Sequence, residues 1–187
     1  MIQLQNYIKG GADMFNEARM MGVIAGIAVG LLFTFVIFRF VNRNKKMTTE
    51  YDEMQQQIRG VGYKYAFYTV ILYEALMGVL MMGTEVPAEP YVIHFAAIFL
   101  GVTVQASYCI WNDAYVGLNT NLKRFIAVTA IVSVINLAVA FIAWRTGSLF
   151  ADGRLQAQTT NLLCGLMFAV LGITGLARKL SAGREDE

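Results

Sequence analysis

The sequence predicts an all-α membrane protein, a polytopic bundle of five transmembrane helices with its N-terminus outside and its C-terminus in the cytoplasm. Of the 187 residues, 57% are hydrophobic and only 15% are charged, whereas ordinary soluble domains carry about a quarter charged residues. Five stretches between charged side chains reach or nearly reach the roughly 20 apolar residues that a transmembrane helix needs. These apolar stretches make the lipid bilayer the expected surroundings of the protein. The formal net charge of +2 is too small to indicate a nucleic-acid partner.

Gaps in the distribution of charge define the five predicted spans. A charged side chain at the bilayer centre costs about 2.5–3.5 kcal/mol on insertion scales, so a long charge-free stretch indicates a helix in lipid. The stretches are apolar on all sides rather than alternating with a period of two, which argues against the strands of a membrane barrel. The predicted spans are about 20–41, 64–84, 90–112, 124–144 and 157–178.

The lysines and arginines of the connecting segments predict the orientation. Eleven of them lie in the segments on one side of the predicted bundle and four on the other. Cytoplasmic loops carry the excess of Lys and Arg, so the side with eleven is expected in the cytoplasm of a bacterial cell, and the protein in the inner membrane. Residues 181–187 are then a short cytoplasmic tail.

The first span is expected to stay in the mature protein, after an interfacial segment at residues 1–19 on the outer surface. Basic residues follow it closely and no small-x-small cleavage site comes after it, unlike in a signal peptide. Gly22, Gly26 and Gly30 are spaced four apart, which places them on one helix face where another backbone can approach. We expect this face to pack within the bundle, with homo-oligomerisation through the first span as the alternative.

A short amphipathic helix is predicted at residues 47–60, on the cytoplasmic surface. Thr49 and Asp52 resemble a capping box, and Gly60 and Gly62 are expected to end the helix. Its apolar face would lie on lipid beside acidic headgroups or would bind a cytoplasmic partner. The residues that share this face are Tyr51, Met54 and Ile58.

Two stretches, EYDEMQQQIRGVGYKYAF at residues 50–67 and CIWNDAY at 109–115, carry a resemblance. Together they resemble a group of small, uncharacterised multi-pass membrane proteins of Firmicutes, which share an acidic juxtamembrane run before a helix that begins with a GxxYAF-like pattern. Met54 departs from that pattern, because arginine is common at this position. Such proteins are often encoded beside small helix-turn-helix regulators, so the resemblance implies a membrane partner of a regulatory pair.

Glu74 is the most informative side chain inside a predicted span. It lies ten residues after Lys64, or about 15 Å along a helix, close to the expected bilayer midplane. Asn136 lies twelve residues after Arg124 and should reach a similar depth. A protonated Glu74 bonded to Asn136 would be structural, whereas an intramembrane carboxyl can also carry a proton or meet a cationic solute. The predicted interior seam of polar side chains comprises Glu74, Gln105, Ser133 and Asn136.

No motif for catalysis, a cofactor or a metal is present in the sequence. The single histidine, His94, lies near the outer end of the third span and is expected at the interface, and Cys109 and Cys164 lie at depths too different for a disulfide. We therefore expect a non-enzymatic membrane protein that acts through partners, in regulation, sensing or protection of the membrane. The alternative is a small solute or proton-coupled transporter, or a transporter subunit, that uses Glu74.

Overall fold

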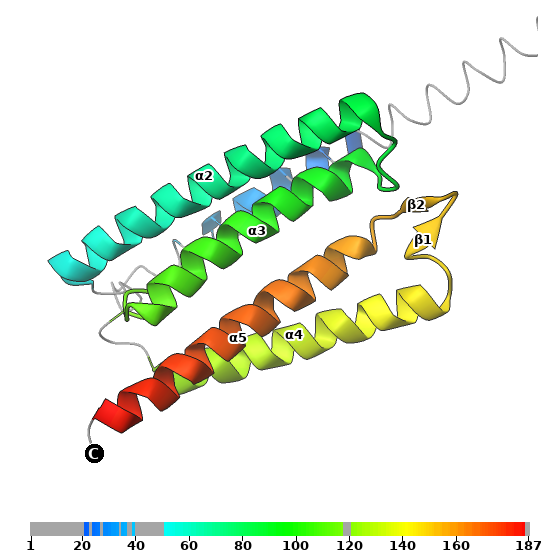
Figure 1. Ribbon diagram of the computed structural model, residues 1–187. Helices are drawn as coiled ribbons and strands as arrows, with labels where there is room; N and C mark the ends of the chain where they lie inside the picture. The colour runs from blue at the N-terminus through cyan, green and yellow to red at the C-terminus, as the bar shows by residue number, and fades with distance from the viewer. Residues whose placement is uncertain are drawn as a thin grey trace, which may run out of the picture. The chain divides into compact units, whose positions relative to one another are not determined.

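The computed structural model describes residues 51–117 and 121–185, together with separate stretches between residues 21 and 39 (Figure 1). Met1–Thr48 and Thr49–Glu187 form two compact units, and each is described by itself. In the first unit the described positions are helical, and they include Gly22, Gly26 and Gly30. The predicted interfacial segment 1–19 lies outside the described residues.

The second unit is helical and contains four helices long and apolar enough to cross a membrane. α3 and α4 begin and end within two residues of the predicted spans 90–112 and 124–144. The last helix continues to Glu185, so the predicted tail is helical over most of its length. The bounds of the helices are α2 Glu53–Gly83, α3 Pro90–Trp111, α4 Leu122–Arg145 and α5 Thr159–Glu185.

The α2 helix corrects one prediction from the sequence. Residues 53–60 of the segment predicted as a separate surface helix are the beginning of this 31-residue helix, which passes through Gly60 and Gly62 without a break. Its N-cap is Asp52, which forms the capping box with Gln55, three residues later, rather than with Thr49. A glycine inside a helix costs only about 1 kcal/mol relative to alanine, and the packing around Gly62 outweighs this cost.

The helices of the second unit lie side by side in the order α2, α3, α5, α4 (Figure 1), and α3 contacts both α2 and α5. α2 and α3 are antiparallel. Gly62 lies against Cys109, Gly101 against Val70, and Glu74 against His94. In this antiparallel register the last turn of α3 lies level with residues 60–63 of α2, so Lys64 lies within the length of α3 rather than beyond its end.

Small residues let α5 approach α4 closely. A Cβ atom placed on Gly165 would come within 2.8 Å of the Leu137 side chain, and one on Gly175 within 3.1 Å of Ile126. Between these contacts, Ser133 Oγ donates a hydrogen bond of 2.8 Å to the Gly165 carbonyl. The small residues Gly165 and Gly175 of α5 therefore serve packing against α4 within the chain.

A two-residue β-hairpin joins α4 to α5, with β1 at Phe150–Ala151 and β2 at Arg154–Leu155. Asp152 and Gly153 both have positive φ, at 51° and 74°, as a type I′ turn requires. Leu155 also bonds to the α2–α3 loop, since its N–H donates to Pro87 and its carbonyl accepts from Glu89. We call this end of the unit the hairpin end, and the opposite end, at the α3–α4 loop, the Asp113 end.

Candidate functional site

Asp113 connects two helices at the Asp113 end. Its φ of 54° is left-handed, a conformation that Asp tolerates better than most residues. The carboxylate accepts from Arg178 of α5, with Nε 3.0 Å and Nη2 2.5 Å from Oδ2. The backbone carbonyl accepts a hydrogen bond of 2.6 Å from Gln55 Nε2 on the first turn of α2. One residue thus connects α2 with α5.

A second contact fixes the start of α2 to the same loop. The Tyr51 hydroxyl donates to the Tyr115 carbonyl at 3.2 Å, and the Arg59 guanidinium lies 4.2 Å above the centre of the Tyr51 ring. The Tyr115 ring packs on Phe125 of α4 with centroids 5.0 Å apart. Burial raises the pKa of the Tyr115 hydroxyl, and the neighbouring Tyr51 raises it further. We call these contacts the Asp113 clamp, which consists of Tyr51, Gln55, Asp113, Tyr115 and Arg178.

The three residues of the apolar face predicted for the segment 47–60 differ in their exposure. Tyr51 and Ile58 are half-buried, and Tyr51 is used inside the clamp, whereas Met54 is 71% exposed. The acidic side chains of Asp52 and Glu53 are exposed beside Met54. Of the three residues, Met54 alone presents a largely open apolar side chain to a partner.

Glu74 pairs with His94 rather than with Asn136. Nδ1 of His94 lies 3.1 Å and 3.2 Å from the two carboxylate oxygens of Glu74. The pair lies on the flank of the α2–α3 hairpin, where the His94 side chain is 65% and the Glu74 side chain 37% exposed. His94 is only four residues into α3, or about 6 Å, so the pair lies near the hairpin end and not at mid-height.

The other residues of the predicted polar seam do not meet Glu74. Asn136 Nδ2 donates to Val132 in its own helix, at 2.9 Å. Ser133 joins α4 to α5, and Gln105 Nε2 lies 3.5 Å from Cys109 Sγ, one turn further along α3. These hydrogen bonds do not join Glu74 to the other residues of the predicted seam, because equal depth in two spans does not establish that the two helices are in contact.

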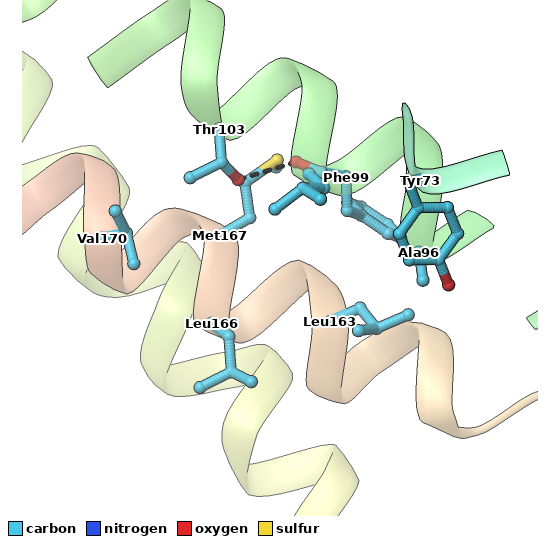
Figure 2. A pocket seen from close by; sticks show the side chains of 9 residues that line it. Tyr73, Ala96, Phe99, Thr103, Leu163, Leu166, Met167 and Val170 are labelled. Atoms are coloured by element: carbon cyan, nitrogen blue, oxygen red, sulfur yellow. Dashed lines mark hydrogen bonds between the residues drawn. The ribbon is translucent and has the colours of Figure 1, made fainter. Parts of the chain in front are cut away.

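An apolar cavity of about 290 Å³ lies among α2, α3 and α5 (Figure 2). Thr103 has its hydroxyl bonded to the Phe99 carbonyl at 2.7 Å, and the Tyr73 ring lies at one end. Such a lining suits a hydrocarbon chain and offers few groups that could orient a polar solute. The lining residues are Tyr73, Ala96, Phe99, Leu100, Thr103, Leu163, Leu166, Met167 and Val170.

The His, Cys, Asp and Glu side chains of the described residues do not gather in one cluster. Within residues 51–117 and 121–185 no group of three His, Cys, Asp or Glu side chains is arranged to hold a metal ion. Cys109 and Cys164 are both free thiols.

Sequence reasoning missed the Asp113 clamp, although two signals were present. Asp113 directly follows the end of a predicted span, where Asn and Asp often adopt the left-handed conformation. Asp113 and Arg178 are also opposite charges predicted on the same side of the bundle. Comparisons with protein-family models, curated proteins and solved structures find no match, so the assignment of function rests on the geometry of this chain.

Proposed function

We propose that the protein is a non-enzymatic, five-span protein of the bacterial cytoplasmic membrane, with its N-terminus outside and its C-terminus inside. It acts by binding a partner at its cytoplasmic end, in regulation, sensing or protection of the membrane. In this orientation the Asp113 end faces the cytoplasm and the hairpin end faces outward.

Charge supports this orientation. The two ends of the second unit differ in their number of Lys and Arg side chains, and the cytoplasmic end of a membrane protein usually carries more of them. Arg59, Lys123, Arg124, Arg178 and Lys179 lie towards the Asp113 end, and Arg145 and Arg154 lie towards the hairpin end.

The observation that carries the proposal is the continuity of α2 with the Asp113 clamp. The first turn of α2 belongs to the same 31-residue helix as the apolar segment, so a partner bound at Met54 would act directly on that helix. Gln55 lies next to Met54 and is bonded to the Asp113 carbonyl, and Asp113 in turn is bonded to Arg178. The effect of a partner bound at Met54 can thus reach α5 through the Gln55–Asp113 and Asp113–Arg178 bonds.

Photo-crosslinking in living cells tests the proposal. A photoreactive residue at Met54 should capture a specific protein, whereas one at Leu72, equally exposed at 71% on the apolar part of α2, should label lipid. Gln55→Ala should reduce the capture at Met54, because it removes the bond to the Asp113 carbonyl and the capping-box bond to Asp52 without altering the Met54 side chain. Only lipid labelling at both positions would contradict a partner-binding role.

The alternative, transport through Glu74, is tested in parallel. Glu74 and His94 are adjacent titratable side chains, which is the observation in its favour. The pair lies on an exposed flank, however, and the other polar residues of the predicted seam bond elsewhere. We expect liposomes containing the wild-type protein and the Glu74→Gln variant to show the same proton flux. A flux that depends on Glu74 would establish the transport alternative instead.

A further inference from the structure

The Glu74–His94 pair is exposed on a helix flank that lipid would otherwise cover. Ionisable side chains within membrane spans usually face the bundle interior, a water-filled cavity or another protein. Here the imidazole is 65% exposed, and only Nδ1 of its two ring nitrogens contacts Glu74. Among the described residues Nε2 has no hydrogen-bond partner, so the pair has capacity for one more polar contact.

The side chains around the pair form a face suited to another helix. On α2, Ile71 and Gly78 lie one turn either side of Glu74, and on α3, Tyr91 and Ile98 lie one turn either side of His94. Ile71, Tyr91 and Ile98 are exposed apolar side chains. A Cβ atom on Gly78 would meet nothing within 4 Å, so a neighbouring backbone could approach there. We call these six residues the Glu74 face.

From this arrangement we infer that the Glu74 face is the interface of a homodimer, occupied by the same face of a second copy. Copies of a membrane protein share one orientation, so a two-fold axis along the membrane normal brings together groups of equal depth. A carboxylate and an imidazole side by side form a self-complementary patch. Nε2 of each His94 can form a hydrogen bond with the Glu74 side chain of the other copy, while Nδ1 stays on Glu74 of its own chain.

The interface has the composition expected of association in a bilayer. Lipid is as apolar as leucine, so the burial of apolar side chains alone does not drive helices together in a membrane. Close approach of the backbones and polar contacts between helices drive the association instead. The Glu74 face supplies both, through Gly78 and through the pair. It is distinct from the predicted association of the first span through Gly22, Gly26 and Gly30.

The test places a photoreactive residue at Ile98 in cells that express two differently tagged copies of the full chain. Val139, on the exposed face of α4, is the matched control. It lies at a similar height, because Leu137 lies against Gly165 of α5, and Leu163 of α5 lines the same apolar cavity as Phe99. The two positions are 55% and 43% exposed. A crosslinked product that contains both tags is expected from Ile98 and not from Val139.

Two variants separate dimerisation from misfolding. Gly78→Leu keeps the Glu74–His94 pair and adds its side chain to open space in the monomer, so it should reduce the Ile98 crosslink while the protein still inserts normally. Glu74→Gln alters both symmetry-related bonds of the dimer, so it should weaken the association by more than about threefold, the average effect of one interhelical hydrogen bond in a membrane. Equal products from Ile98 and Val139, a crosslink unaffected by Gly78→Leu, or a product confined to one chain would overturn the inference.

Discussion

Asp113 holds two helices through two chemically different groups, its carboxylate and its backbone carbonyl. The carboxylate can be removed by mutation, whereas the carbonyl is present in every variant. A substitution can therefore weaken the connection to α5 while the connection to α2 remains. Asn suits this purpose because it keeps the side-chain shape and tolerates a positive φ.

We predict that Asp113→Asn lowers the free energy of unfolding by up to about 1 kcal/mol. The expected loss is small because the Asp113 side chain is 60% exposed, and solvent screens ion pairs at such positions. Unfolding by SDS titration in mild detergent measures the loss. Asp152→Asn is the matched control, because Asp152 also has a positive φ and its carboxylate has no ion pair among the described residues. An equal loss in both variants would show that the ion pair is not the cause.

At the scale of the helix, α2 shows how packing overrides local signals. Gly60 and Gly62 are two residues apart, and both resemble helix stops in the sequence. In the structure a Cβ atom on Gly60 would meet nothing within 4 Å, whereas one on Gly62 would lie 2.9 Å from Cys109 Sγ. Gly62 therefore lets α3 approach α2, and Gly60 has no such part in packing.

This difference predicts opposite effects for one substitution. Gly60→Ala should stabilise the protein by about 0.5–1 kcal/mol, since alanine restricts the unfolded chain and favours a helix. Gly62→Ala should destabilise it by about 1–3 kcal/mol, because the new methyl group overpacks the contact with the buried Cys109. Thermal denaturation of both variants in detergent measures the two changes.

A double variant tests the cause assigned to Gly62. Cys109→Ala removes the sulfur that the new methyl group would meet, so Gly62→Ala should cost less in this background than in the wild type. Additive losses would indicate that Gly62 matters for another reason, such as the Gln105 carbonyl, which an added Cβ atom would approach to 3.4 Å.

For the whole molecule, the sequence predicted the helices better than their contacts. Charge-free stretches locate helices because lipid excludes charge from each helix separately, and α3 and α4 match their predicted spans closely. Contacts depend on which helices are neighbours. Glu74 and Asn136 could be assigned equal depth from the sequence, but α3 and α5 lie between the helices that carry them. Predicting the Glu74–His94 pair would have required the register of α2 against α3, which depends on both helices and cannot be derived from either one alone.

The topology is the property of the whole molecule that the proposed function most depends on. Two exposed positions report on it, Ala157 beside the β-hairpin and Asn112 at the end of α3. In intact cells an impermeant maleimide should label Ala157→Cys, and it should label Asn112→Cys only after the membrane is opened. The native Cys109 and Cys164 are partly or fully buried and should contribute little signal. The reverse pattern would place the Asp113 clamp outside the cell, where no cytoplasmic partner could reach Met54. Asn112→Cys and Ala157→Cys remove no basic residue, so the excess of eleven over four is unchanged and neither substitution should alter the orientation.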